Sequence, residues 1–264
     1  ISKAVISTVP ADLTATYNFD IELKPAVTAT YKTSAGGTVS FTSGKATVPV
    51  TGGSSVTIVG LPVTMTYDIV EQSVNYMTTA PAKASGTITT TKSLAAFTNT
   101  RGKGDLSVTK KVNSTTTTDH TKLFTFTIQL DDATVNGTFG DMTFDNTGKA
   151  TVTLKDTESA TAKNLPEGIG YTVTETPESG FVTTPAAPVT GKISSTSAST
   201  AAFTNTKDEG GLIVTKTVKS AVPGDDQVSF DFKVELGDTT INGKYGDMTF
   251  ANGVYNFSLK DSES

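Results

Sequence analysis

Hydrophobic and polar residues alternate along most of this chain. In the run Leu106–Val112, every second residue falls on one face of an extended strand, and that face is apolar except for Lys110. No helical period persists over eleven residues. The alternating runs between residues 104 and 209 are Leu106–Val112, Phe124–Leu130, Met142–Phe144, Ala150–Leu154, Ala160–Lys163, Tyr171–Glu175, Phe181–Thr184 and Ala201–Asn205. Short strands with turn residues between them predict an all-β fold of the Ig-like sandwich class.

The same strings of sequence recur along the chain. Leu106–Lys110 returns as Leu212–Lys216, and Phe139–Phe144 returns as Tyr245–Phe250, both at a shift of 106 residues (110 to 216). The first copy fits more loosely: Gly44–Val48 returns as Gly148–Val152 at a shift of 104 (44 to 148), and Ala95–Thr100 returns as Ala201–Thr206 at a shift of 106 (95 to 201). The chain is therefore expected to consist of tandem copies of one domain.

The repeats place the domain boundaries in charged, glycine-bearing linkers. We expect Ig-like domains at residues 1–103 and 104–209, and the N-terminal half of a third repeat at residues 210–264. The third copy stops at Ser264, which aligns with Ser159. It thus has Lys216, and the strands that would carry its partner residues are missing, so Lys216 is expected to be unpaired in this chain.

Two matched sets of polar residues share the inward face with apolar neighbours. The first set is Lys3, Glu71 and Asn99, and the second is Lys110, Glu175 and Asn205. Alternation puts Glu175 on the face of Tyr171 and Val173, and Asn205 on the face of Phe203. Buried ionisable groups normally neutralise, pair or react, so these two triplets are the candidate chemistry of the chain.

Composition narrows the class of protein. The net charge of −5 and the absence of a basic cluster argue against a nucleic-acid partner. No apolar run is long enough to span a bilayer, and no signal peptide precedes Ile1, so a mature or excised segment is expected. A threonine-rich, all-β repeat chain with no cysteine resembles extracellular proteins of Gram-positive bacteria, which are commonly stable without disulfides, although a cytoplasmic protein could also lack cysteine.

Residues of the second copy carry a family resemblance. The run from Phe144 to Ser159, then Asn164–Gly168, Tyr171–Glu175 and Phe203–Asn205, resembles the pilin isopeptide-linkage domains of Gram-positive pilus shafts and surface adhesins, related to the collagen-adhesin B-type (CnaB-like) repeats. The resemblance covers the second copy throughout, the key strands of the first, and the front half of the third. It implies a wall-anchored surface protein whose partners are other pilus subunits or flanking repeats.

The resemblance also implies a reaction within each complete copy. Lys110 would join Asn205 with Glu175 as promoter, and Lys3 would join Asn99 with Glu71. Burial favours the neutral forms of the Lys amine and the Glu carboxyl, and we expect the carboxyl to hydrogen-bond the Asn carbonyl. The reaction occurs once per domain, so the chain is expected to be a structural protein and not an enzyme, with no cofactor.

Two alternatives remain open at this point. Each triplet could be a hydrogen-bonded core network that never reacts. The sandwiches could instead form a binding module that presents loops to a host glycan or matrix protein. An exposed aromatic cluster or a non-repeating insertion would favour binding, and the sequence has neither.

Other candidate sites are explained by local structure. Oxygen-rich stretches could bind calcium, but turn chemistry accounts for the same residues, and no metal site is expected. These residues are Asp131, Asp132, Asn136 and Asp141, with Asp238, Asn242 and Asp247 in the third copy. Leu61–Thr64 resembles the start of a sortase signal but is expected to be a turn before a strand. His120, the single histidine, is expected in a solvated loop.

Overall fold

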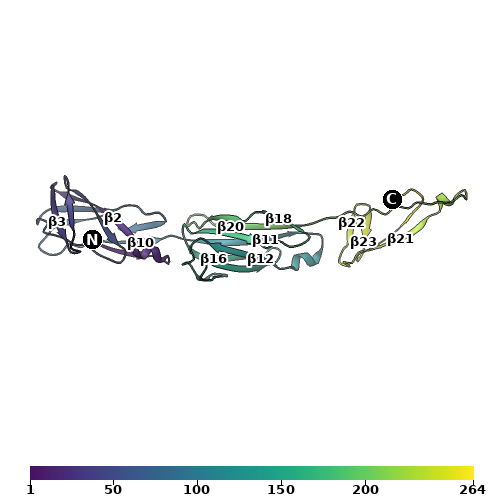
Figure 1. The fold of residues 1–264 in the computed structure, drawn as a ribbon, viewed down its shortest axis with the longest axis horizontal. Helices are drawn as coiled ribbons and strands as arrows, with labels where there is room; N and C mark the ends of the chain where they lie inside the picture. Colours follow the sequence, from purple (N-terminus) through teal and green to yellow (C-terminus); the bar gives the residue numbers. More distant parts are fainter.

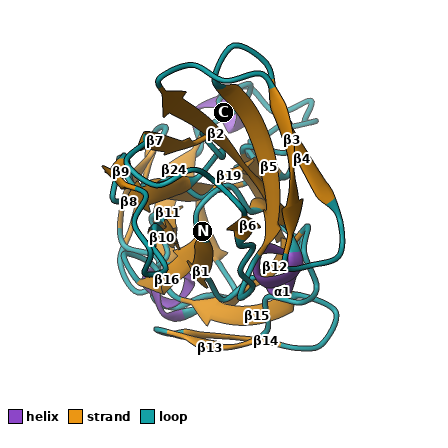
Figure 2. Cartoon of the chain, turned by 90° about the vertical axis from the view of Figure 1, so that its left-hand side faces the viewer, coloured by secondary structure: helices purple, strands orange, loops and turns teal.

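The structure, a computed structural model, describes residues 1–264 as three bodies in a row (Figure 1). Every sheet draws its strands from only one of three stretches, which we call the first segment (residues 1–102), the second segment (103–207) and the third segment (208–264). Figure 2 looks along the long axis, from which the segments overlap in projection. None of the helices has the length and apolar character of a membrane-spanning helix.

The second segment is a sandwich of two four-stranded sheets. The first sheet has the order β16-β11-β20-β18 and the second the order β15-β12-β17-β19. Their strands are β11 (Lys103–Asn113), β16 (Ser159–Pro166), β18 (Phe181–Thr184), β20 (Ser199–Lys207), β12 (Phe124–Leu130), β15 (Lys149–Leu154), β17 (Gly170–Glu175) and β19 (Val189–Lys192). A hairpin of β13 (Gly137–Phe139) and β14 (Met142–Phe144) and a 3-10 helix η1 (Thr117–Thr121) complete it. The predicted all-β sandwich is confirmed.

First and last strands of the second segment are parallel neighbours. In the pairing of β11 with β20, Lys110 lies opposite Phe203, and Val112 lies opposite Asn205. Lys110 and Asn205 therefore occupy diagonal positions on the same inward face. On the facing sheet, β12 pairs with β17 so that Phe126 lies opposite Glu175.

The first segment repeats this plan with a shorter first strand. Its sheets have the orders β1-β10-β8, β5-β2-β7-β9 and β4-β3-β6. The strands are β1 (Ser2–Ile6), β10 (Ala96–Arg101), β8 (Met77–Ala80), β5 (Lys45–Thr51), β2 (Thr16–Lys24), β7 (Thr66–Glu71), β9 (Ala84–Thr87), β4 (Thr38–Phe41), β3 (Ala29–Thr33) and β6 (Ile58–Val59), with the helix α1 (Pro10–Thr14). Strand β1 runs parallel to β10, with Lys3 opposite Phe97 and Val5 opposite Asn99. Val63 and Thr64 form a turn just before β7, as the sequence predicts.

The third segment contains two hairpin pairs. They are β21 (Phe230–Glu235) with β24 (Val254–Leu259), and β22 (Gly243–Tyr245) with β23 (Met248–Phe250), and η2 (Asp225–Gln227) precedes them. The stretch around Lys216 forms no strand, although it repeats a contact of the second segment. The amide of Val218 donates to Asp261 Oδ1 at 2.6 Å, as that of Val112 donates to Asp156 Oδ1 at 2.7 Å.

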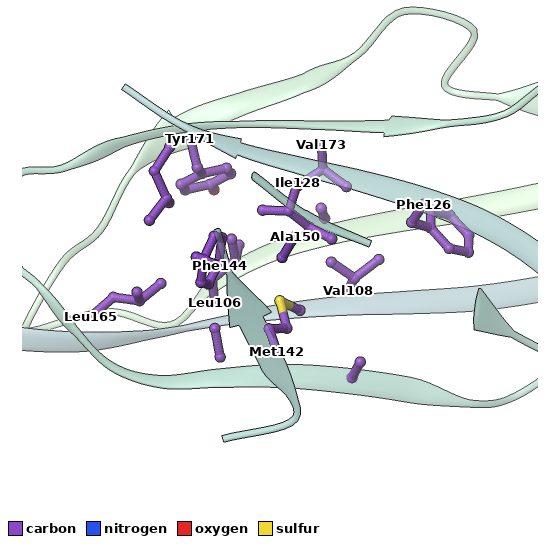
Figure 3. Packing of buried hydrophobic residues seen from close by; sticks show 14 of the residues in the cluster. Leu106, Val108, Phe126, Ile128, Met142, Phe144, Ala150, Leu165, Tyr171 and Val173 are labelled. Carbon is purple, nitrogen blue, oxygen red and sulfur yellow. The ribbon is translucent and has the colours of Figure 1, made fainter. Parts of the chain in front are cut away.

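Alternate strand residues fill the core between the two sheets of the second segment. Figure 3 shows residues from both sheets meeting there, among them Val108, Phe126 and Val173, each fully buried. The hairpin β13–β14 adds Met142 and Phe144 at one side of this core. Burying one such side chain contributes about 1.5–3 kcal/mol, and this packing fixes which face each strand turns inward.

The junction between the first two segments is built of specific contacts. Arg101, the last residue of β10, donates from Nη1 to both oxygens of Asp12 at 3.0 Å, and from Nε and Nη2 to the Glu167 carbonyl at 3.0 and 2.7 Å. Tyr76 packs over Gly168, where a Cβ atom would lie 2.5 Å from the ring. Val9 of the first segment is buried within the core cluster of the second. Only Gly102 separates β10 from β11, so this connection is a close-packed joint.

Candidate functional sites

The structure brings together all three polar residues of the second predicted triplet. Lys110 Nζ donates to Glu175 Oε1 at 2.8 Å and to Oε2 at 3.0 Å, and Asn205 Nδ2 donates to Glu175 Oε1 at 2.6 Å. Lys110 is 3 % exposed and Asn205 is 0 % exposed. The lysine and asparagine come from one sheet and the glutamate comes from the sheet that faces it, so the site spans the interior of the sandwich.

The first triplet has a closely similar arrangement. Lys3 Nζ donates to Glu71 Oε2 at 2.7 Å, and Asn99 Nδ2 donates to Glu71 Oε1 at 2.6 Å. All three residues are buried. Although only two residues precede Lys3, β1 is paired along its length with β10 and holds the lysine in place.

Each lysine nitrogen lies close to an aromatic ring. Lys110 Nζ lies 4.1 Å from the centroid of the Phe124 ring, and Phe126 packs on Phe203 with centroids 5.3 Å apart. Lys3 Nζ lies 4.5 Å from the Tyr17 ring centroid. An ammonium ion gains some cation–π attraction in such a place but loses its hydration shell.

Burial shifts the proton equilibrium of both amines in the same direction. It lowers the pKa of Lys110 below its ordinary value, while the hydrogen bond and charge of Glu175 oppose this effect. Burial likewise lowers the pKa of Lys3, opposed by Glu71. A lowered pKa increases the fraction of each lysine that is present as the neutral, nucleophilic amine at a given pH.

Each glutamate bridges two nitrogen atoms, which differs from the sequence-based expectation. We expected the Glu carboxyl to hydrogen-bond the Asn carbonyl, but in both sites its oxygens accept from the lysine Nζ and the asparagine Nδ2. The side-chain hydroxyl of Thr79 instead donates to Asn99 Oδ1 at 2.7 Å. The alternation of inward and outward residues along a strand predicts which residues meet. It does not determine which atoms of an amide face the carboxylate.

A family profile matches most of the chain. It is described as a domain of unknown function, DUF7601, and it matches residues 1–101 and again residues 104–207. The chain belongs to this family. The two matched stretches each contain one complete Lys, Glu and Asn site, so the DUF7601 domain and the buried triplet recur together.

Solved structures provide a further comparison for the DUF7601 domains. The major pilin protein T-13 from Streptococcus pyogenes is 20% identical, with a TM-score of 0.49 over 78% of this chain and 95% of that chain. The major pilin T3.2 from the same organism is 18% identical, with a TM-score of 0.47 over 79% and 96%. The pilus-presented adhesin Cpa is 22% identical, with a TM-score of 0.36 over 56% and 38%. No curated protein matches the chain.

Lys216, beyond the second DUF7601 match, has no acidic partner. Its Nζ lies 3.9 Å from the centroid of the Phe230 ring, and it forms no ion pair. Its backbone repeats the pairing of Lys110: the amide of Lys216 donates to the Glu263 carbonyl at 3.1 Å, as that of Lys110 donates to the Glu158 carbonyl at 3.0 Å.

The remaining candidates have structural roles. Asp131 Oδ1 accepts from the Gly170 amide at 2.9 Å, and Asp132 Oδ1 accepts from the Thr134 amide at 2.9 Å, as turn chemistry predicts. His120, expected in a solvated loop, is partly exposed at the surface but lies in a short helix. His120 lies in η1, where Nδ1 is 2.7 Å from Asp156 Oδ2 and Nε2 is 3.0 Å from the Ser114 carbonyl oxygen.

Proposed function

We propose that this chain is a structural stalk or shaft segment of a bacterial surface pilus or adhesin, stabilised by Lys–Asn isopeptide bonds within its domains. The observation that carries this proposal is the pair of buried triplets, in which a carboxylate bridges the amine and the amide that would react. In this proposal residues 1–103 and 104–209 are the two cross-linked domains, and residues 210–264 belong to a third repeat. The partners are flanking repeats or other subunits of the same fibre at the outer surface of a Gram-positive cell.

In this reaction the glutamate accepts and returns each proton that has to move. In the second site, Glu175 first takes one proton from the Lys110 ammonium, and the neutral Nζ then attacks Asn205 Cγ. The Glu175 carboxyl gives its proton to Nδ2 while the resulting carboxylate takes a second proton from Nζ. The Cγ–Nδ2 bond breaks, and ammonia departs as the new Nζ–Cγ amide forms.

Proximity supplies most of the rate in this scheme. The amine and the amide are held against one carboxylate in a water-poor interior, which converts a reaction between two molecules into a step within one fold. The glutamate already contacts the nitrogen that loses protons and the nitrogen that must gain one. No external catalyst or cofactor is needed for this single turnover.

The product suits a load-bearing role. A bond between Lys110 and Asn205 would close a loop of roughly 95 residues, which in the chain-entropy model stabilises the fold by about 4–5 kcal/mol. Since β11 and β20 are parallel neighbours, it would also tie together the two strands through which tension enters and leaves the domain.

Intact mass under denaturing conditions tests the proposal. We expect the purified full-length chain to be lighter than its sequence by two molecules of ammonia. Lys110→Ala should restore one of them, whereas Lys111→Ala, at the adjacent solvent-facing position, should leave the deficit at two. A wild-type mass equal to that of the unreacted sequence would rule out the proposal.

A further inference from the structure

The two sites treat the asparagine carbonyl oxygen differently. In the first site Asn99 Oδ1 accepts a hydrogen bond from Thr79 Oγ1 at 2.7 Å. In the second site Asn205 Oδ1 is buried and has no hydrogen-bond partner. An unpaired buried carbonyl oxygen is uncommon, because leaving a polar group without a partner costs about 1–3 kcal/mol.

Residue identity does not explain this difference. Thr79 lies on β8 directly opposite Asn99, and Thr183 lies on β18 directly opposite Asn205. Both threonines are half-buried in strands that pair antiparallel with the strand of their asparagine. The same residue type thus occupies the same register position, but only the Thr79 hydroxyl reaches the carbonyl oxygen.

The carbonyl oxygen is where negative charge develops during bond formation. When the lysine Nζ lone pair forms the Nζ–Cγ bond, the π electrons of the carbonyl move to Oδ1 and give an oxyanion. They return when the Cγ–Nδ2 bond breaks. A donor placed at Oδ1 in advance stabilises this charge without reorganisation. Glu71 is not that donor, because its oxygens accept from Lys3 and Asn99 nitrogens.

We propose that Thr79 is a catalytic residue of the first site, donating a hydrogen bond to the oxyanion that forms on Asn99. The second site lacks such a donor. This inference rests on the proposed isopeptide reaction and adds an order to it: the Lys3–Asn99 bond forms faster than the Lys110–Asn205 bond in the same molecule. Both sites share the bridging glutamate, and the donor to the asparagine carbonyl oxygen is the difference between them that acts on the developing negative charge.

Refolding kinetics of the full-length chain test the assignment. Chain that has not yet reacted is recovered in denaturant and diluted into native buffer. Samples are quenched at intervals and digested. Mass spectrometry then quantifies the cross-linked peptides of each site. Thr79→Val, which removes the hydroxyl and keeps the branched shape, should slow the first bond on the order of 100-fold. Thr79→Ser should retain a rate within several-fold of the wild type. The rate at which the second bond forms in the same molecules is the internal reference.

Thr183→Val is the matched control in the second site. It should leave the rate of the second bond unchanged, because Thr183 does not contact Asn205 Oδ1. Circular dichroism recorded during refolding shows whether Thr79→Val merely delays folding; equal folding rates with a slow first bond support the proposal.

Three results would overturn it. The first is a Thr79→Val rate equal to the wild-type rate while both bonds still form, which removes the role of Thr79 and leaves the proposed function intact. The second is equal slowing by Thr79→Val and Thr183→Val, each at its own site, which would show that the sites do not differ. The third is the absence of any bond in the wild type, which removes the proposed function together with this inference.

Discussion

At the scale of single residues, the bridging glutamates are the most consequential groups of the fold. Each accepts hydrogen bonds from a buried ammonium and a buried amide at 2.6–2.8 Å. Removing one partner of such a group would leave the others buried without compensation, which typically costs several kcal/mol. The proposed isopeptide bond would relieve that problem, because it would convert the amine and the amide into one neutral linkage.

We expect Glu175→Gln to prevent the second bond and leave the first intact. A glutamine keeps the shape of Glu175 but cannot accept protons from Lys110 Nζ or pass one to Asn205 Nδ2, so ammonia cannot leave. Intact mass should show a deficit of one ammonia, with the cross-linked peptide of the first site still present. Glu178→Gln, at a nearby surface position, should retain both. Two ammonia losses in Glu175→Gln would contradict the role given to the carboxylate.

His120 should make the second segment more stable at low pH. The hydrogen bond to Asp156, followed by that to the Ser114 carbonyl, raises the pKa of His120 above its ordinary value. A raised folded-state pKa gives stability that is fully present below the unfolded-state value, about 6.5, and is lost as pH rises through the folded-state value. His120→Gln should lower the melting temperature by roughly 2–5 °C at pH 5 and by less at pH 9. A pH-independent difference would contradict this account.

The alternation of inward and outward residues in the sequence predicts which residues form the sites, but local geometry determines their atomic contacts. Lys110, Glu175 and Asn205 could be grouped because each shares a face with core residues such as Phe203. The donor role of Thr79 could not be found, since Thr183 occupies the same position in an equivalent strand and does not make the bond. The contacts of His120 could not be predicted because its partner, Asp156, is distant in sequence and meets it only in the folded segment.

At the scale of elements, most strand limits follow from alternation. Phe124–Leu130, Met142–Phe144 and Phe181–Thr184 agree with the structure to the residue. Strands β13 and β19 were missed because Gly137–Phe139 and Val189–Lys192 are short runs without a clear alternating face. Strand β13 is stabilised by its hairpin with β14, and β19 is stabilised by pairing with β17.

The joint between the first two segments depends on Arg101. We expect Arg101→Ala to widen the range of angles between these segments, because it removes the bonds to Asp12 and to the Glu167 carbonyl. The chain has no cysteine, so spin labels at Ser73→Cys and Ser195→Cys report one distance between the segments by double electron–electron resonance. The distribution should broaden in Arg101→Ala and stay narrow in Lys103→Ala. An unchanged distribution would mean that Tyr76 and Val9 suffice.

The sequence predicts a linker at this joint and does not reveal the contacts that fix it. Arg101–Gly104 is charged and contains two glycines, which is typical of a linker at a domain boundary. In the structure Gly102 and the neighbouring strands leave no free linker there, and Gly104 lies within β11. The contacts that fix the joint come from loops far apart in sequence, at Val9, Tyr76 and Gly168, so no local pattern could reveal it.

At the scale of the whole molecule, the proposed cross-links should alter how the chain responds to force. Pulled from its ends, the wild type should release little length from the second segment, because tension passes through the Lys110–Asn205 bond. In Lys110→Ala the enclosed stretch can extend, and one unfolding event should release on the order of 300 Å of contour length. Single-molecule force spectroscopy measures this step. The same step in the wild type would show that the bond bears no load.

The parallel pairing of first and last strands also sets how such a protein can grow. Since β11 and β20 run in the same direction side by side, the chain enters the second segment at one end and leaves at the other. Each added repeat would extend the reach of the molecule by about 36 Å, the length of an eleven-residue strand such as β11, without changing its width. Duplicating or deleting one repeat in the gene would therefore change the distance between the ends in fixed steps and leave every existing interior as it was.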